Sequence, residues 1–294
     1  MTKKEFLENG KHMSKKVQVI CLWWHKLVIG QELLQNLPNW KVIVNSGVGM
    51  DHLGLKLVTI FDMKMPNAPC AVSSSTADAG MALLLASVRR LVEGYPVAIS
   101  AGMEHSKADF LGVDVTEATL GIIGMGSIGY MIPLRPKAFE MDILYHNRTR
   151  RKEQEEQAVG ATYCAKIDSL LQQADFVMVV VSLTPQTRKL VGKREVKLMK
   201  PTATLVNISR GAVVDQGSPV TALQSGVTGA TALDVTCPEP LPRDNTLLKL
   251  KNIIIMPHLG IETDKAIYTI TEEAAENILS ALKGLPIPSE VLPR

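Results

Sequence analysis

Short apolar runs alternate with stretches of helical periodicity along the chain. This alternation predicts an α/β fold built on a mainly parallel sheet. A long helix is expected from Thr76 to Glu93, with Gly94 as its end. The other elements predicted in the first third are strands at Val17–Leu22, Lys41–Val44 and near Met63, and helices at Gln31–Asn36 and Asp51–Phe61.

A polar, irregular stretch follows Tyr95-Pro96 and runs to about Glu117. We interpret it as a connector between two domains, because a second and denser series of elements begins after it. The strands predicted there are Thr119–Gly124, Asp142–His146, Thr162–Tyr163, Asp175–Val181, Thr204–Ile208, Ala230–Val235 and Ile253–Met256. The main helices predicted there are Thr149–Val159, Asp215–Ser225 and Thr263–Lys283.

The composition excludes several classes of protein. With 294 residues the chain has room for two domains. Its formal net charge of +3 argues against a nucleic-acid-binding surface, which is strongly basic. Its apolar runs fall short of the roughly 20 residues of a membrane helix. Four scattered cysteines without a CxxC pair are typical of reduced cytosolic thiols, and the histidines lack metal-ligand spacing. We therefore expect a cytoplasmic protein with no metal, membrane or nucleic-acid partner.

A glycine-rich turn directly follows the first strand of the second series. Gly124, Gly126 and Gly129 form a GxGxxG motif that encloses Ser127 and Ile128. After a strand and before a helix, this pattern is typical of dinucleotide binding, with the pyrophosphate at the helix N-terminus. The alternative, a plain glycine turn, is common elsewhere, but here further strand–helix units follow the motif.

The end of the next strand bears on the choice of dinucleotide. NAD-binding proteins place an acidic residue there, on the ribose 2′-OH. This chain has Asn147 instead, followed by Arg148 and Arg150, and arginine pairs well with a 2′-phosphate. The pattern predicts NADP(H) as the preferred cofactor and NAD(H) as the weaker one. The alternative is an ordinary solvated charge run at the start of a helix.

Three polar residues follow the ends of later predicted strands. Arg210, Glu239 and His258 should meet at the carboxyl edge of a parallel sheet, where α/β proteins place their chemistry. Arg can bind a carboxylate in a fork, His can donate a proton, and Glu can orient the His. The set suits reduction of an α-keto acid. Taken singly, each residue has a structural interpretation as a surface, loop or strand-end residue.

Several motifs together resemble the D-isomer-specific 2-hydroxyacid dehydrogenase family, most closely its glyoxylate/hydroxypyruvate reductase branch, which includes probable 2-ketogluconate reductases. The resemblance covers nearly the whole chain. The motifs that carry it are Gly47-Val-Gly-Met-Asp51, Val72-Ser-Ser-Ser-Thr-Ala-Asp78, Gly124-Met-Gly-Ser-Ile-Gly129, Ser182-Leu-Thr-Pro-Gln-Thr187, Asn207-Ile-Ser-Arg-Gly211, Leu233-Asp-Val-Thr-Cys-Pro-Glu-Pro-Leu-Pro242 and Pro257-His-Leu-Gly260.

The resemblance implies a Rossmann-type doubly wound parallel sheet at residues 96–263. It also implies a smaller flavodoxin-like α/β substrate domain at 1–95 plus 264–294, with the active site in the cleft between them. It implies that Arg210, Glu239 and His258 are the catalytic residues. It also implies that the backbone amides of Val48 and Gly49 bind the substrate carboxylate. A homodimer is also implied, with the connector and nearby helices in its interface. The further cofactor contacts implied are Ser182, Leu183, Thr187, Ile208, Ser209, Asp234 and Gly260.

The chain departs from the family pattern in places. We expect the first strand–helix unit of the substrate domain to be missing, which would leave an exposed sheet edge. Pro133 and Pro136 fall in the helix after the glycine turn, where the family has ordinary helix formers. Interior prolines break helices, so we expect that helix to kink or to end near Ile132. The start of the helix at Gln216–Pro219 is altered as well.

Two functions remain open on the sequence. The first is an enzyme that reduces small 2-keto acids, such as glyoxylate, hydroxypyruvate or 2-ketogluconate, to D-2-hydroxy acids. The second is a dinucleotide-binding scaffold with little turnover, since the family includes nucleotide-sensing corepressors that keep the Arg–Glu–His set. The enzyme is favoured because the reductase branch is the closer resemblance.

Overall fold

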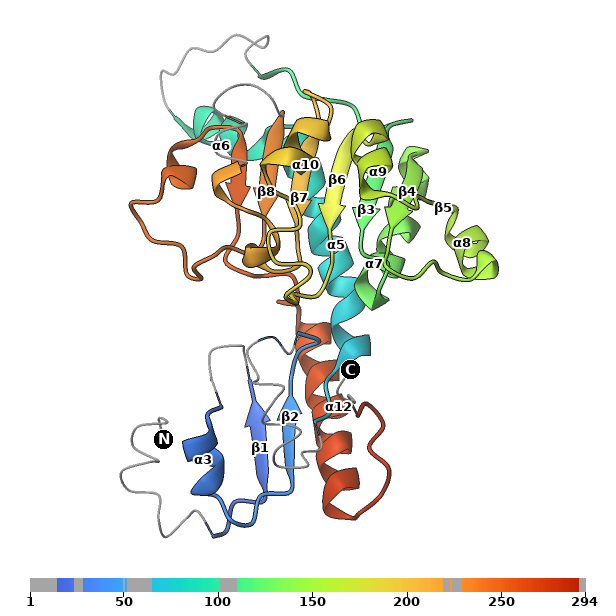
Figure 1. Ribbon diagram of the computed structural model, residues 1–294. Helices are drawn as coiled ribbons and strands as arrows, with labels where there is room; N and C mark the ends of the chain where they lie inside the picture. Colours follow the sequence, from blue (N-terminus) through green and yellow to red (C-terminus); the bar gives the residue numbers. More distant parts are fainter. Residues whose placement is uncertain are drawn as a thin grey trace. The chain divides into compact units, whose positions relative to one another are not determined.

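The computed structural model describes residues 15–23, 29–49, 51, 65–100, 110–218, 223 and 229–290. The chain forms two compact units, Met1–Val72 with Glu262–Arg294, and Ser73–Ile261 (Figure 1). The predicted strand near Met63 lies outside the described residues, as do most of the helices predicted at Asp51–Phe61 and Asp215–Ser225.

A seven-stranded parallel sheet organises the second unit (Figure 1). Its strand order is β5-β4-β3-β6-β7-β8-β9. The chain adds β4 and β5 on one side of β3 and then crosses back to add β6 on the other side, so the strand order reverses between β3 and β6. This confirms the predicted doubly wound α/β fold, whose ligands bind where the strand order reverses. The strands are β3 (Thr119–Ile123), β4 (Asp142–His146), β5 (Ala161–Tyr163), β6 (Phe176–Val179), β7 (Thr204–Asn207), β8 (Ala230–Leu233) and β9 (Ile253–Ile255).

Helices cover both faces of this sheet. Successive residues of a strand point to opposite faces, and Ile122 and Ile123 of β3 accordingly belong to two different hydrophobic clusters. The cluster around Ile122 includes Leu84 of α5, whereas the cluster around Ile123 includes Leu170 of α9 and Val196 of α10. The helices are α5 (Pro69–Val88), α6 (Leu91–Ile99), α7 (Ser127–Met131), α8 (Glu153–Val159), α9 (Ile167–Gln173) and α10 (Lys193–Leu198).

The long helix predicted to end at Gly94 ends earlier. α5 stops at Val88, Arg90 takes a left-handed backbone (φ 51°), and α6 then runs through Gly94 and Pro96. A distant segment sets this break. The N–H of Val113 donates to the carbonyl of Val88 at 3.0 Å, so the carbonyl is satisfied without another helical turn.

The boundary between the two units also differs from the sequence estimate. The structure divides the chain after Val72, near the start of α5, whereas the expected boundary at residue 95 lies within α6. The reason is packing, because Ala77, Met81 and Val88 of α5 belong to the same core as the strands of the second unit. The second boundary, at residues 261 and 262, lies close to the expected one.

The helix after the glycine turn is short, as its prolines predicted. α7 ends at Met131, and two 3₁₀ turns, Ile132–Leu134 and Pro136–Phe139, continue the chain. Both prolines occupy the first turn of their 3₁₀ element, where no N–H donor is needed. Arg135 closes this segment by donating to the carbonyl of Met131 at 2.6 Å.

In the first unit, β1 (Val19–Leu22) and β2 (Val42–Asn45) form a two-stranded parallel sheet. The helices described are α3 (Gln31–Gln35) and α12 (Asp264–Leu282). Thr263 is the N-cap of α12, and its hydroxyl accepts from the N–H of Ala266. Its Ala274 packs with Val42 and Val44 of β2, which covers one face of the small sheet.

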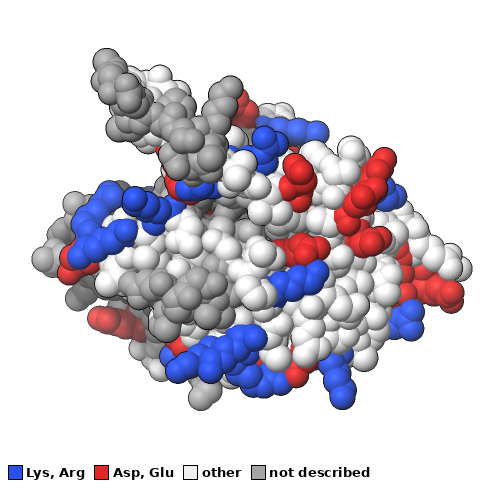
Figure 2. All heavy atoms as spheres, turned by 90° about the horizontal axis from the view of Figure 1, so that it is seen from above, with Lys and Arg blue, Asp and Glu red and all other residues white. Residues whose placement is uncertain are grey.

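Two surface features bear on partners. By length and hydropathy, the Ala71–Val88 window of α5 could span a membrane, but 56% of it is buried, as in the core helix of a globular protein. On the face shown in Figure 2, basic and acidic side chains of the described residues are interspersed, and neither sign forms a continuous patch.

Candidate active site

Glu239 and His258 meet at the carboxyl edge of the second unit's sheet. β8 ends at Leu233 and β9 at Ile255, and each residue lies in the loop that follows its strand. Glu239 Oε1 lies 2.8 Å from His258 Nδ1, and both side chains are about a quarter exposed or less. A carboxylate on Nδ1 fixes the ring orientation and tautomer of a histidine. The predicted pair is thus assembled within one unit.

Asp234 holds the turn that carries His258. Its carboxylate is buried and accepts from the N–H groups of Leu259 at 2.8 Å and Gly260 at 3.0 Å. Its carbonyl accepts from the N–H of His258 at 2.7 Å. Burial raises the pKa of Asp234, while the two N–H donors and the nearby His258 act in the opposite direction. His258 itself has a left-handed backbone (φ 62°), which this clamp stabilises.

Arg210 follows β7 in a turn that its neighbours order. The Asn207 side-chain oxygen accepts from the N–H and hydroxyl of Ser209, at 3.0 and 2.7 Å, and its amide donates to the Arg210 carbonyl at 3.1 Å. Arg210 Nη1 donates to the Ser209 carbonyl at 2.8 Å. Ser209 and Ile208 are buried beside it. Asn207 was not predicted as a site residue, although it opens the motif that contains Arg210.

Gly211 brings the arginine turn against the loop that leads to Glu239. A Cβ at this position would lie 2.0 Å from the carbonyl carbon of Thr236 and 2.6 Å from the nitrogen of Cys237. The two backbones can approach this closely only because Gly211 has no side chain. Gly211 was also not predicted as a site residue, and the signal for it was the final glycine of the Asn207–Gly211 motif.

The three glycines after β3 have different roles. Gly124 has φ 105°, and a Cβ there would lie 2.6 Å from the Val180 carbonyl oxygen. A Cβ at Gly129 would lie 2.1 Å from the carbonyl oxygen of Gly124, so both glycines are required by the packing of the turn. A Cβ at Gly126 would meet nothing within 4 Å. Gly126 is exposed and leaves the backbone open to a ligand.

This open backbone fits a dinucleotide pyrophosphate. Gly126 is the N-cap of α7, and no side chain caps this end, so the first N–H groups, from Ser127 and Ile128 onward, have no intrahelical acceptor. Such N–H groups bind phosphate oxygens. Asn147, at the end of β4, supports the turn by accepting from the N–H of Met125 at 3.2 Å.

The two arginines predicted for the 2′-phosphate lie in different environments. Arg148 is exposed and has no ion pair among the described residues. Arg150 donates to both carboxylate oxygens of Glu156, at 2.9 and 2.8 Å. The sequence did not indicate this pairing, because it places Glu156 only within the helix predicted at Thr149–Val159.

The remaining predicted cofactor residues lie in loops at the same sheet edge, after β6. Ser182, Leu183 and Thr187 belong to one turn, in which the Thr187 hydroxyl donates to the Ser182 carbonyl at 2.6 Å. The same hydroxyl accepts from the N–H of Thr184 at 2.8 Å. The turn is therefore ordered by its own threonines.

Val48 and Gly49 belong to the first unit, in the loop after β2. The Asn45 side-chain amide donates to the carbonyls of Gly47 and Gly49, at 2.6 and 3.0 Å. Asn67 donates to the Val48 carbonyl at 3.4 Å. These hydrogen bonds use the carbonyl oxygens of the loop. Val48 and Gly49 themselves are partly exposed.

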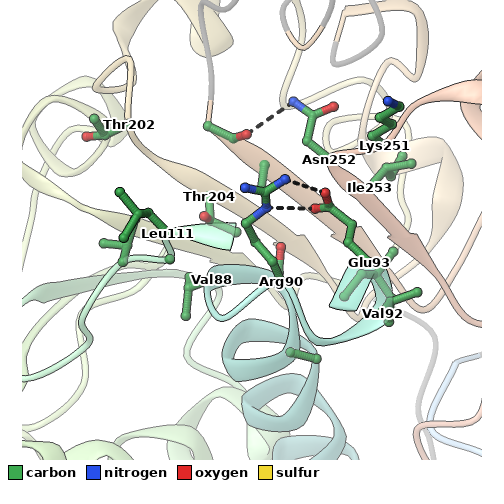
Figure 3. Close-up of a pocket in the computed structure, with 17 residues that line it drawn as sticks. Val88, Arg90, Val92, Glu93, Leu111, Thr202, Thr204, Lys251, Asn252 and Ile253 are labelled. Atoms are coloured by element: carbon green, nitrogen blue, oxygen red, sulfur yellow. Dashed lines mark hydrogen bonds and ion pairs between the residues drawn. The ribbon is translucent and has the colours of Figure 1, made fainter. Parts of the chain in front are cut away.

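A cavity of about 290 Å³ lies at the opposite edge of the second unit's sheet (Figure 3). It is lined by Thr204, Ala230 and Ile253, the first residues of β7, β8 and β9 respectively. The Arg90–Glu93 ion pair borders it (Figure 3). This cavity is separate from the Glu239–His258 pair, because the two lie at opposite ends of the same strands.

Several known proteins are similar to this chain in sequence and in fold. Glyoxylate reductase of Thermococcus litoralis is 39% identical over 261 residues, which cover 87% of this chain and 78% of that protein. Glyoxylate/hydroxypyruvate reductase B of Yersinia pestis is 37% identical over 259 residues, with the same coverage. A glyoxylate reductase structure from Paecilomyes thermophila has a TM-score of 0.87 and 30% identity, covering 98% of this chain and 88% of that chain.

A family model matches most of the second unit. Residues 81–260 match the family described as D-isomer specific 2-hydroxyacid dehydrogenase, NAD binding domain. The match includes the glycine turn after β3 and the Glu239–His258 pair, and the second unit is thus the part that binds a nicotinamide dinucleotide in this family. The chain accordingly belongs to the D-isomer specific 2-hydroxyacid dehydrogenases, in their glyoxylate/hydroxypyruvate reductase branch.

Proposed function

We propose that the protein reduces glyoxylate, hydroxypyruvate and related 2-keto acids, including 2-ketogluconate, to D-2-hydroxy acids, with NADP(H) preferred over NAD(H). The observation that supports this most strongly is the 2.8 Å contact between Glu239 and His258 at the sheet edge where the glycine turn also lies. Hydride addition to a carbonyl group gives an alkoxide that must take up a proton, and a histidine oriented by a carboxylate can supply that proton.

Each residue has a separate task in this proposal. His258 donates the proton to the substrate's carbonyl oxygen, and Glu239 holds the imidazole in place. Arg210 binds the substrate carboxylate and polarises the carbonyl, and the amides of Val48 and Gly49 add to carboxylate binding. The bound nicotinamide supplies the hydride. Asp234 keeps His258 at its position by holding the backbone of the next two residues.

The cofactor preference rests on the end of β4. Asn147 stands where a carboxylate would bind the 2′-OH of NAD, and its side chain is already bonded to Met125 and Thr149. Arg148 follows it, exposed and without an ion pair in the described part of the chain. A charge-assisted bond from this guanidinium to a 2′-phosphate favours NADPH by roughly 1.5–3 kcal/mol, about tenfold or more in affinity.

We also propose that the protein is a homodimer. Large apolar side chains are exposed along α6 and in the segment after residue 110, among them Leu91, Tyr95, Ile99 and Leu111. Exposed apolar groups of this extent mark interaction surfaces. Sedimentation of the wild type against Tyr95→Glu tests the assignment. A wild-type monomer would refute it.

The activity is tested by following NADPH consumption by the purified protein with glyoxylate, hydroxypyruvate and 2-ketogluconate. We expect turnover with at least the first two. NADPH binding without turnover on any of these keto acids would refute the enzyme and favour a dinucleotide-binding scaffold. Titration of both cofactors by fluorescence tests the preference, and equal dissociation constants would refute it.

A further inference from the structure

A buried hydrogen-bond network lies under the turn between β4 and α8. Tyr145 is fully buried, and its hydroxyl donates to the Glu156 carboxylate. The same hydroxyl accepts from the N–H of Arg151 at 3.0 Å. Glu156 is only 6% exposed and also accepts two bonds from Arg150, at 2.9 and 2.8 Å. One carboxylate thus joins the strand, the turn and the helix.

Glu156 is charged at neutral pH. Hydrogen bonds from Arg150 and Tyr145 hold its pKa at about 2, against the opposing effect of burial. Burial and the bond to Glu156 raise the pKa of Tyr145 to about 12, so the phenol remains a donor. Arg150 and Glu156 therefore form a bidentate ion pair of two opposite full charges.

The Arg150–Glu156 pair affects which arginine side chains of this turn are available to bind a ligand. Two donors of the Arg150 fork face Glu156, and its guanidinium lies over the Tyr163 ring, 5.5 Å from the centroid. Arg151 is also engaged, with the Met125 carbonyl at 2.8 Å and Glu155 at 3.0 Å. Of the three arginines in this turn, Arg148 has no ion pair within the described residues.

We propose that Glu156 is a specificity-determining residue that withholds Arg150 from the cofactor's 2′-phosphate and leaves that contact to Arg148. This inference rests on the proposed preference for NADP(H). It makes a separate prediction, which concerns the effect of Glu156 on that preference. By fixing the Arg151 N–H through Tyr145, the network also positions the turn on which Arg148 stands.

The test compares dissociation constants for NADPH and NADH, using their ratio so that losses common to both cofactors cancel. In Glu156→Gln, Arg150 is released, and the ratio should shift toward NADPH by about threefold or more, the effect of one surface charge. The charge-neutral double variant Arg150→Gln/Glu156→Gln should return to the wild-type ratio. Arg148→Gln should shift the ratio toward NADH by about tenfold.

Arg150→Lys keeps the charge beside Glu156 and provides a test if Glu156→Gln does not fold. Its ratio should equal that of the wild type. A tenfold loss of NADPH preference in Arg150→Lys or in the double variant would show that Arg150 contacts the 2′-phosphate and overturn the inference. An unchanged ratio in folded Glu156→Gln would overturn it as well.

The wild-type ratio tests the proposed preference separately. If the wild type binds NADH as tightly as NADPH, the preference is wrong. The shift in Glu156→Gln relative to that wild type, and its reversal in the double variant, still decide the role of Glu156.

Discussion

Gly211 is the position at which a single added methyl group should separate the catalytic turns. In Gly211→Ala the new Cβ would lie 2.0 Å from the carbonyl carbon of Thr236 and 2.1 Å from its oxygen. Non-bonded carbon atoms ordinarily lie about 3.5–4.0 Å apart. The turn that carries Arg210 and the loop that leads to Glu239 must therefore move apart by on the order of 1 Å.

The displacement should reduce turnover far more than cofactor binding. A misplacement of about 1 Å costs on the order of 10²-fold in rate, so kcat with glyoxylate should fall by that factor. Overpacking should also lower the free energy of unfolding by about 1–3 kcal/mol. The dissociation constant for NADPH should change less than kcat does, because the glycine turn after β3 and Arg148 do not take part in this contact, and only the cofactor contacts expected from Ile208 and Ser209 move with the displaced turn.

The assay compares steady-state kinetics, NADPH titration and chemical denaturation for wild type, Gly211→Ala and Gly217→Ala. Gly217 is the matched control, because a Cβ there would meet nothing within 4 Å. It lies six residues along the same chain segment and should tolerate alanine without loss of rate. If Gly211→Ala turns over as fast as the control, the close approach of the two turns does not set the position of Arg210, and the reasoning is refuted.

His258→Ala should lose about 10²–10⁴-fold in turnover while NADPH binding is retained; equal rates of glyoxylate reduction would show that another group donates the proton. The pKa of Glu156 is lowered from 4.5 to about 2 in the folded protein, so its contribution to stability is present above pH 4.5 and is lost as the pH falls toward 2. Between those values the unfolding free energy of wild type should fall more steeply with acid than that of Glu156→Gln, and parallel curves would contradict the assignment. Pro133→Ala and Pro136→Ala should each lower stability by about 0.4–1 kcal/mol in a thermal melt, because both prolines fit the 3₁₀ turns and restrict the unfolded chain. A higher melting temperature would show that they strain the segment instead.

The sequence determined the sheet of the second unit closely. β4 has the bounds that its apolar run predicted, and β3 and β7 differ by one residue at one end. Buried parallel strands are short and apolar throughout, which makes them visible without tertiary information. The glycine turn was predictable for the same local reason, since Gly124 needs a positive φ that other residues rarely adopt.

The chemistry of the site was partly predictable. Glu239 and His258 were expected together because strands of a parallel sheet end at one edge, and the structure places them 2.8 Å apart. Asn207 and Gly211 were not singled out, because the hydrogen bonds of the first and the close contact of the second exist only once β7 and β8 are paired. Both residues act through contacts with backbone atoms, and such contacts cannot be recognised from the residue type alone.

Tertiary structure alone decided where α5 ends and what Arg150 binds. The end of α5 depends on a bond to Val113, which is 25 residues away in the sequence, so no local stop signal marks it. From the sequence, Arg150 is a candidate to bind a phosphate. In the structure its guanidinium pairs with the buried carboxylate of Glu156. Local propensity and spacing determine which elements form, whereas burial and long-range pairing determine which charges remain for a ligand.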